Sequence, residues 1–204
     1  MLTLYADRYS PNSRKVHWAL EECGAPYEYK LISIRKGEQK TPEFVKLNPN
    51  ARVPVITDDD FVLWESNAIL WYVADKLGRG KIVPDDVKKR ALIDQWMWWQ
   101  ASDLALISKP WFMKLMGKLG QQVDVETHAR ALQTAMPKLP ILEGHLKDRK
   151  YVTGDEFSIG DIALAEFAGL SEMAGADMEP FPAIRAWLAR LAERPAFQKT
   201  RPPA

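Results

Sequence analysis

Residues 53–78, VPVITDDDFVLWESNAILWYVADKLG, decide the fold of this chain. Two short runs rich in β-branched and aromatic residues, 53–56 and 61–64, flank three aspartates, and this pattern predicts a β-hairpin. Ser66 is expected to cap a helix that begins directly afterwards and ends before Gly78. A hairpin followed by a helix is part of a small α/β unit, so the residues before it must supply the remaining strands.

The residues before the hairpin predict alternating strands and helices. Strands are expected at residues 2–5 and 27–32, with a helix at 13–23 between them that Gly24 ends. Thr41, Pro42 and Glu43 predict the start of another short helix, with proline at its first position. The resulting order, β-α-β-α-β-β-α, combines a parallel βαβ unit with a hairpin and a helix. This order is typical of a thioredoxin-like domain.

After Gly78 the strand patterns disappear. Residues 79–85 have the glycine, proline and charge content of a linker, and Asp85 or Asp86 is expected to cap a long helix. The chain then has helical periodicity throughout, with predicted breaks at Pro110, Gly117, Gly120 and Gly154 and around residues 175–182. We therefore predict an α/β thioredoxin-like domain at 1–78 and an all-α domain at 86–204, joined by a linker at 79–85.

Two patterns in the helical half are structural. The segment FSIGDI at residues 157–162 is a capping box. The Ser158 side chain can accept from the backbone N–H of Asp161, and the Asp161 side chain can accept from the backbone N–H of Ser158. Ile184, Trp187, Leu188 and Leu191 recur at helical spacing, which predicts a helix packed on the core.

Composition excludes several classes of protein. The 204 residues are 47% hydrophobic, and the net charge is +1, so no basic excess indicates a nucleic-acid partner. No apolar run is long enough for a signal peptide or a membrane span. The single cysteine excludes an internal disulfide framework, and the three scattered histidines do not predict a metal site. We expect a soluble cytoplasmic protein with no membrane partner and no metal.

The segment YSPN at residues 9–12 is the first candidate site. Ser10 and Asn12 are common helix caps, which is the structural interpretation. Free N–H groups at a helix start also favour an anion, especially a thiolate, and the cations Arg14 and Lys15 follow immediately. No histidine follows a candidate nucleophile at a useful sequence position, although a catalytic triad could still assemble in space.

Three further groups could complete a ligand site. A cis bond before Pro54 would turn the backbone of Val53 outward, where it could pair with an extended peptide, although an ordinary strand-start proline fits equally well. Glu65 and Ser66 offer a carboxylate and a hydroxyl that complement an amino-acid head group. Asp103 falls in an expected apolar stripe with Leu92, Trp96, Trp99 and Leu106, where an aspartate should be paired or lie at a site.

Together these segments resemble a glutathione S-transferase over nearly the full length. The resemblance rests on SPNSRKVHWALEE after the first strand, NPNARVPVI before the third, ESNAILWYVADKLG, and FSIGDIALA in the helical half. The N-terminal serine is similar to that of the bacterial theta-like and nu-like branches. The resemblance implies a homodimeric detoxifying transferase that joins glutathione, its co-substrate, to a hydrophobic electrophile.

The resemblance also implies residue roles. Ser10 would hydrogen-bond the glutathione sulfur, and Asn12 would assist it. The remaining glutathione-binding residues would be Gln39, Lys40, Arg52, Val53, Pro54, Glu65, Ser66 and, from the partner subunit's side, Asp103. The electrophile site would be lined by the long helix, Trp111 and Phe112.

Several alternatives stay open from the sequence. Tyr5 and Tyr9 compete with Ser10 as sulfur donors, while Cys23 lies on the apolar face of its helix and is interpreted as core. The chain could instead be a glutathione-dependent peroxidase or disulfide reductase. It could also be a non-catalytic interaction protein, which would be expected to lose the YSPN donors or Glu65 and Ser66.

Overall fold

The computed structural model describes residues 1–202, and these divide into two compact units. The first unit comprises Met1–Asp85 together with the segment that begins at Glu193, and the second comprises Asp86–Ala192. The sequence-based division had assigned everything after residue 85 to the helical domain. In the structure the segment after Ala192 packs with the first unit instead, because α11 (Pro195–Lys199) contacts α1 (Pro11–Cys23).

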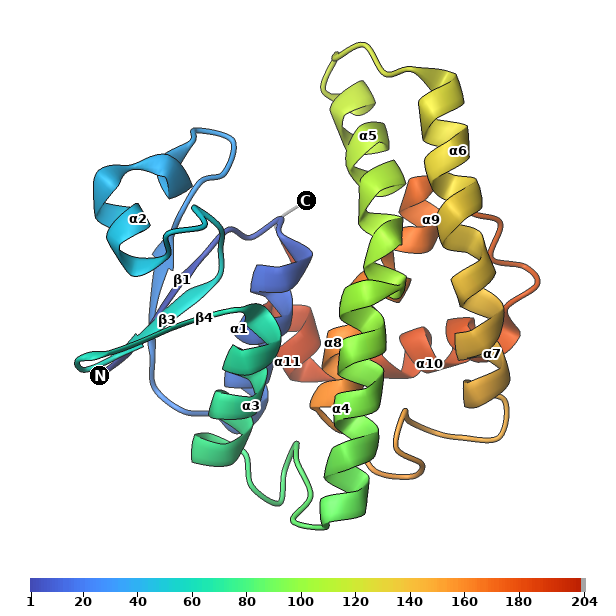
Figure 1. Cartoon of the computed structure of the whole chain (residues 1–204). Coiled ribbons are helices and arrows are strands. Elements are labelled where there is room, and N and C mark those ends of the chain that lie inside the picture. The colour runs from blue at the N-terminus through green and yellow to red at the C-terminus, as the bar shows by residue number, and fades with distance from the viewer. Residues whose placement is uncertain (203–204) are drawn as a thin grey trace. The chain divides into compact units, whose positions relative to one another are not determined.

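The first unit is built on a four-stranded sheet within the described chain, in the order β2-β1-β3-β4. The strand β1 runs parallel to β2 and antiparallel to β3, and β3 and β4 form the predicted hairpin. Helices α1 and α3 lie side by side on one face of the sheet, and α2 lies apart from them (Figure 1). The elements are β1 (Leu2–Ala6), β2 (Glu28–Leu31), η1 (Glu38–Lys40), α2 (Pro42–Leu47), β3 (Val55–Asp58), β4 (Phe61–Trp64) and α3 (Ser66–Leu77). The predicted thioredoxin-like order is therefore confirmed.

Local chemistry explains where these elements begin and end. Pro11 occupies the first position of α1, whose last turn is closed by Gly24 in the left-handed conformation with φ 65°. Thr41 caps α2 through a hydrogen bond that its side chain accepts from the Phe44 N–H at 3.4 Å. The prediction that Ser66 caps α3 was wrong by one residue. The N-cap position belongs to Glu65, which makes no side-chain capping bond, and Ser66 begins the helix.

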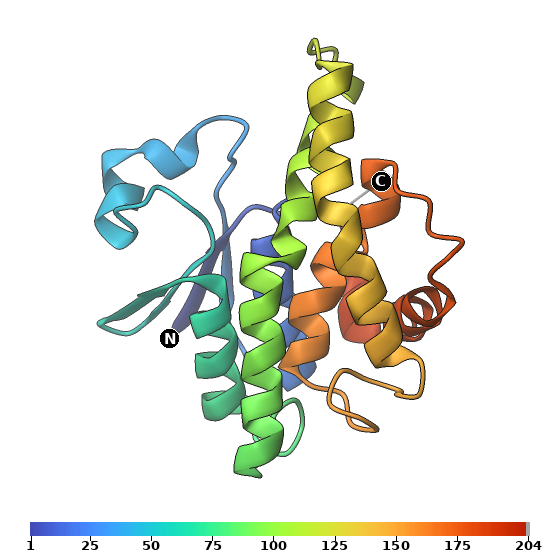
Figure 2. The same cartoon turned by 45° about the vertical axis from the view of Figure 1, so that its right-hand side comes forward.

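The second unit is all helical in the described chain. Its elements are α4 (Val87–Ser102), η2 (Leu104–Ile107), α5 (Ser108–Lys118), α6 (Val125–Ala135), η3 (Met136–Lys138), α7 (Leu139–Leu146), α8 (Ile159–Ala168), α9 (Leu170–Ala174) and α10 (Pro182–Ala192). Figures 1 and 2 both show α5 and α6 side by side, and α8 is buried along its whole length. Asp86 caps α4, as one of the two predicted candidates.

Two predictions for α4 and α5 were wrong. The buried face of α4 is formed by Ile93, Trp96, Met97 and Gln100, so the expected stripe with Leu92 and Leu106 does not hold, and both leucines are exposed. Pro110 lies in the first turn of α5, where its missing N–H removes no helical hydrogen bond. The break in the helix therefore comes earlier, at Asp103 and η2.

The capping box at the start of α8 is confirmed and has further bonds. Asp161 accepts from the backbone N–H of Ser158 at 2.9 Å, and the Ser158 hydroxyl accepts from the Gly160 N–H at 3.2 Å. The same carboxylate also accepts from the N–H of Val152 at 2.8 Å and from the indole of Trp187 at 2.9 Å. Asp161 thus ties α8 to the preceding loop and to α10.

Candidate functional site

The register of the sheet brings three of the predicted site segments of the first unit to one end of the sheet. Tyr5 pairs with Val55, and Val55 pairs with Trp64, so these three residues form a row across β1, β3 and β4. Beyond this row, β1 continues toward the YSPN turn and β4 continues into Glu65-Ser66. Val53-Pro54 directly precedes β3. These three segments, which are distant in sequence, therefore lie at the same end of the sheet.

A direct hydrogen bond joins two of these segments. The Ser66 hydroxyl donates to Asn12 Oδ1 at 3.0 Å, which connects the first turn of α1 to the first residue of α3. The sequence predicted both residues for the site but not their contact. This bond positions the Asn12 amide, and its Nδ2 group donates no hydrogen bond to any other residue of the described chain.

Ser10 has the geometry of both a cap and a donor. Its oxygen accepts from the Ser13 N–H at 3.3 Å, so the capping interpretation is correct. Its O–H donates to no other residue in the part of the chain that the structure describes, and the side chain is half-buried. The first turn of α1 contains no acidic side chain. The hydroxyl proton and the positive end of the helix are both available to an anion.

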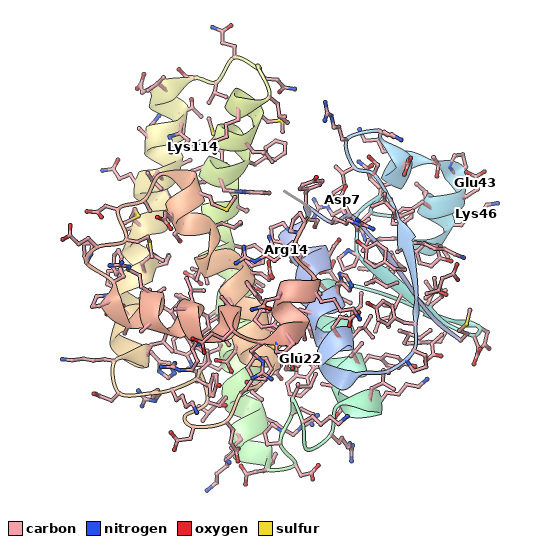
Figure 3. The ribbon with its side chains drawn as sticks, turned by 180° about the vertical axis from the view of Figure 1, so that it is seen from behind. Asp7, Arg14, Glu22, Glu43, Lys46 and Lys114 are labelled. Carbon is pink, nitrogen blue, oxygen red and sulfur yellow. The ribbon has the colours of Figure 1, made fainter. Side chains whose placement is uncertain are left out.

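Asp7 is a buried carboxylate that holds the turn in place, and sequence reasoning missed it. One of its oxygens accepts from the Tyr9 N–H and the other from the Ile34 N–H, each at 2.8 Å. The Ser13 hydroxyl and the Asp7 N–H are 3.2 Å apart, and the Ser10 N–H donates to the Asp7 carbonyl at 3.2 Å. In Figure 3 Asp7 is labelled close to the start of α1. The signal in the sequence was an acidic residue directly after an apolar strand.

The peptide bond between Val53 and Pro54 is cis. The alternative of an ordinary trans strand-start proline was therefore wrong. Neither the N–H nor the C=O of Val53 makes a hydrogen bond within residues 1–202, because β3 begins only at Val55. The backbone N–H and C=O of Val53 are therefore available to pair with an extended segment, as in a β-sheet.

Glu65 has an unusual backbone conformation beside this edge. Its φ is 71°, a value that costs a non-glycine residue of the order of 1–3 kcal/mol and that is concentrated at functional sites. The side chain is exposed and forms no ion pair with the described residues. The carboxylate is therefore available to a cationic group of a ligand.

Gln39, Lys40 and Arg52 lie in the connection between β2 and β3. Gln39 is buried, and its side-chain oxygen has no hydrogen-bond partner in the described chain. Lys40 and Arg52 are exposed, and the Arg52 carbonyl accepts from Asn48 Nδ2 at 2.7 Å. The unused amide of Gln39 has the capacity to bind a polar ligand group.

Of three further residues that the sequence singled out, Asp103 is paired and Cys23 is buried, as expected, whereas Lys15 has other surroundings. Asp103, in the second unit, is the C-cap of α4, and its carboxylate binds Lys138 at 2.6 Å and Ser102 at 2.6 Å. These two hydrogen bonds hold the pKa of Asp103 below its usual value. Lys15 is buried rather than solvated, and its ammonium donates to Asn67 Oδ1 at 2.6 Å. Cys23 is buried, as interpreted.

The described residues contain no cluster of three or more His, Cys, Asp or Glu side chains that could hold a metal ion. In the same residues no helix is long and apolar enough to cross a bilayer.

A thioredoxin-like unit that carries an unused hydroxyl, a helix start and a free extended backbone at one end of its sheet has the groups that suit an extended ligand with an anionic group. Two family models match this chain. They are the N-terminal domain of glutathione S-transferases at residues 1–75 and their C-terminal domain at residues 106–195. The chain belongs to the glutathione S-transferase family.

Similar proteins agree with this assignment. Glutathione S-transferase GstB of Escherichia coli K12 is 33% identical over 201 residues, which cover 98% of this chain and 97% of that protein. A theta-class glutathione S-transferase of Xanthomonas axonopodis pv. citri, solved with glutathione bound, is 34% identical with a TM-score of 0.90 and covers 100% of this chain and 98% of its own. A glutathione transferase of Burkholderia graminis, with two glutathione molecules bound per subunit, is 31% identical with a TM-score of 0.84 and covers 98% of this chain and 86% of its own.

Proposed function

We propose that this protein is a glutathione transferase that stabilises the glutathione thiolate for attack on a hydrophobic electrophile. The observation that carries the proposal is the free hydroxyl proton of Ser10 at the start of α1. A free thiol has a pKa of about 8.5, so little of it is ionised at neutral pH. A donor at the positive end of a helix favours the thiolate over the thiol and so lowers that pKa.

The backbone of Val53 would hold the middle of the tripeptide. Its N–H and C=O would pair with the cysteinyl residue of glutathione, which would bring the sulfur toward Ser10. The free Nδ2 of Asn12 would be a second donor to the sulfur, oriented by Ser66. This arrangement supplies the nucleophile from the ligand, which explains why no general base is needed beside Ser10.

The two ends of glutathione would be bound by opposite charges. Glu65 would accept from the γ-glutamyl ammonium, and the N–H at the start of α3 would bind the α-carboxylate, because the Ser66 hydroxyl proton is engaged with Asn12. Lys40, Arg52 and the buried Gln39 would face the glycine carboxylate. The electrophile site would involve the second unit, including α4 and the half-buried Trp111 and exposed Phe112.

The assembly belongs to the same proposal. A homodimer is expected, in which Asp103 would reach the γ-glutamyl group of the partner's glutathione. The bonds of Asp103 to Lys138 and Ser102 would have to rearrange or be shared for this contact. A cytoplasmic location and a role in detoxification are consistent with such an enzyme.

The test is binding to immobilised glutathione, followed by the rate with an activated aryl halide beside the rates with an organic hydroperoxide and a mixed disulfide. We expect binding and a dominant aryl transfer rate. Absence of binding would exclude every glutathione-dependent function. A dominant hydroperoxide or disulfide rate would replace transfer by peroxidase or reductase chemistry.

Glu65→Gln provides a sharper test of the site. Removing the carboxylate should weaken glutathione binding roughly tenfold or more, since hydrogen bonds to charged groups contribute about 1.5–3 kcal/mol. Isothermal titration would measure the affinity. Glu43→Gln is the matched control, because Glu43 is an exposed carboxylate on α2 that Figure 3 labels away from Asp7. Equal affinities of the two variants would remove Glu65 from the site.

A further inference from the structure

Asp7 connects two parts of the proposed glutathione site. One of its carboxylate oxygens accepts from the Tyr9 N–H at 2.8 Å, inside the turn that leads to Ser10. The other oxygen accepts from the Ile34 N–H at 2.8 Å, in residues 33–40, which we call the glycine-side segment. The Asp7 side chain is only 7% exposed, so both bonds are strengthened by the low dielectric around them. One buried carboxylate therefore fixes the distance between the turn and the segment.

The glycine-side segment is itself held together by hydrogen bonds. The Gly37 N–H donates to the Ile34 carbonyl at 3.0 Å, and the Lys40 N–H donates to the Gly37 carbonyl at 2.9 Å. The Ser33 N–H donates to the Glu38 carboxylate at 2.7 Å. These bonds link Ile34 to Lys40 in two short steps. The position of Lys40, which is proposed to face the glycine carboxylate, therefore depends on where Ile34 is held.

The turn on the other side of Asp7 sets the direction of the Ser10 hydroxyl. The Ser10 N–H donates to the Asp7 carbonyl at 3.2 Å, and the Asp7 N–H donates to the Ser13 hydroxyl oxygen at 3.2 Å. The Ser13 N–H in turn donates to the Ser10 side-chain oxygen at 3.3 Å. These bonds join the three residues in a closed ring. Because a hydrogen bond weakens steeply when its angle is poor, a shift of Asp7 would reduce the donation by Ser10 to a ligand.

We propose that Asp7 is a positioning residue that couples the binding of the glycine carboxylate of glutathione to the ionisation of the glutathione thiol. This coupling rests on the proposed function, because it links the two ends of the same site. A glycine carboxylate bound at Lys40 holds the glycine-side segment in place. Asp7 passes this constraint to the turn, where the Ser10 hydroxyl then points at the thiolate. Such coupling is reciprocal, so ionisation of the thiol also strengthens the binding of the glycine carboxylate.

Two ligands and two forms of the full-length protein test the coupling. Glutathione amide differs from glutathione only in its uncharged glycine end. For each complex the measured quantity is the lowering of the thiol pKa on binding, relative to the free ligand, from the pH dependence of thiolate absorbance. In the unaltered protein the lowering should be about one pKa unit larger for glutathione than for its amide, which is a coupling at the lower end of the usual range.

Asp7→Asn should remove this difference between the ligands. An asparagine has one acceptor oxygen where the aspartate has two, so one of the bonds to Tyr9 and Ile34 is lost. The two ligands should then differ by less than roughly 0.3 pKa unit. Loss of the negative charge by itself shifts the thiol pKa equally for both ligands, so the difference between them reports the coupling and not the charge.

Asp58→Asn is the matched control. Asp58 is a carboxylate of similar burial in the same sheet, where it binds Lys76 and Tyr72 at the opposite end of β3 from Val55. This variant should keep the difference of about one pKa unit between the ligands. Loss of the difference in Asp58→Asn would mean that any weakening of the sheet has the same effect, and would overturn the role of Asp7.

Ser10→Ala tests the same connection without altering Asp7, in case Asp7→Asn does not fold. Because the coupling acts through the Ser10 hydroxyl, the thiol pKa of the two ligands should be lowered alike in this variant. A difference that persists in Ser10→Ala or in Asp7→Asn, or that is absent from the unaltered protein, would overturn the coupling. None of these results removes the proposed function, which fails separately if glutathione does not bind.

Discussion

At the level of single residues, the site depends on protons that the protein itself does not use. Ser10 accepts a capping bond but keeps its own hydroxyl proton for a ligand, and Asn12 keeps both Nδ2 protons while its oxygen binds Ser66. The geometry of Ser10 therefore permits a helix cap and the proposed donation to a thiolate at once.

Ser10→Ala should raise the pKa of the bound glutathione thiol while leaving glutathione affinity nearly intact. Loss of one donor to the thiolate corresponds to roughly one pKa unit, or about 1.4 kcal/mol, and thus to about a tenfold slower reaction at neutral pH. The pH dependence of thiolate absorbance in the binary complex measures the shift. An unchanged thiol pKa would transfer the role of main donor to Asn12 or Tyr5.

Thr134→Ala is the control for that measurement. Thr134 is exposed on α6 in the second unit, where its hydroxyl donates to the Arg130 carbonyl. The thiol pKa should be the same in this variant as in the unaltered protein.

Cys23 should be almost unreactive in the native protein. Burial raises the pKa of its thiol to about 11, so at pH 8 only about 0.1% is thiolate. Alkylation by iodoacetamide at pH 8 should therefore be at least about a hundredfold slower in the folded protein than in urea. Fast alkylation of the folded chain would show that Cys23 is accessible and would reopen a chemical role for it.

At the level of elements, two helices are capped by aspartates in opposite environments. Asp161, at the third position of α8, is buried, and burial raises its pKa to about 6. Asp124, the N-cap of α6, is exposed, and its hydrogen bonds to Thr127 hold its pKa below the ordinary value. The same residue type should thus affect stability with opposite dependence on pH.

The comparison of Asp161→Asn with the unaltered protein tests this difference. Between pH 4 and pH 6 only the folded form retains the Asp161 proton, so its contribution to the free energy of unfolding falls as the pH rises. The advantage of the unaltered protein over the variant should decline by about 3 kcal/mol across this range. Urea unfolding at four pH values between 4 and 7 measures the decline.

Asp124→Asn is the matched control with the opposite sign. The lowered pKa of Asp124 contributes stability above its unfolded value, near pH 4, and this contribution is lost as the pH falls through the folded pKa. Its effect should therefore be constant from pH 5 to pH 7. A decline for Asp124 in that range, or a rise for Asp161, would contradict the assignment.

At the level of the whole molecule, the segment that contains α11 packs against α1. Arg194 binds Glu22 through two hydrogen bonds of 2.6 and 2.8 Å, and the Phe197 ring lies 4.8 Å from Trp18. Glu22 is labelled beside α11 in Figure 3. The last segment is therefore part of the first unit, although 107 residues of the second unit separate the two in sequence.

Arg194→Gln should destabilise the protein by about 1–3 kcal/mol. It removes a bidentate, charge-assisted pair and leaves Glu22, whose side chain is only 10% exposed, without its guanidinium partner. Urea unfolding gives the free energy, with the exposed Arg185→Gln as control. An effect no larger than that of the control would mean that the Arg194–Glu22 pair contributes little to holding α11 against α1.

The sequence by itself determined the order of elements and most of their ends. Gly24, Thr41-Pro42, Asp86 and the capping box at Ser158 act within one helical turn, so their chemistry can be read locally. The sequence left open whether the bond before Pro54 is cis, and the structure shows that it is. The helix caps, by contrast, need no knowledge of distant residues.

Tertiary structure decided which of these residues meet. Asn12 and Ser66 are 54 positions apart, Asp7 and Ile34 are 27 apart, and Glu22 and Arg194 are 172 apart. Local propensities do not encode such pairs. The pairs depend on the register of the strands and on how the helices pack, and the connecting segments of the chain do not dictate that packing. The sequence therefore specified the groups that could serve a site, and only the packed fold decided which proton, backbone group and charge remained free to serve it.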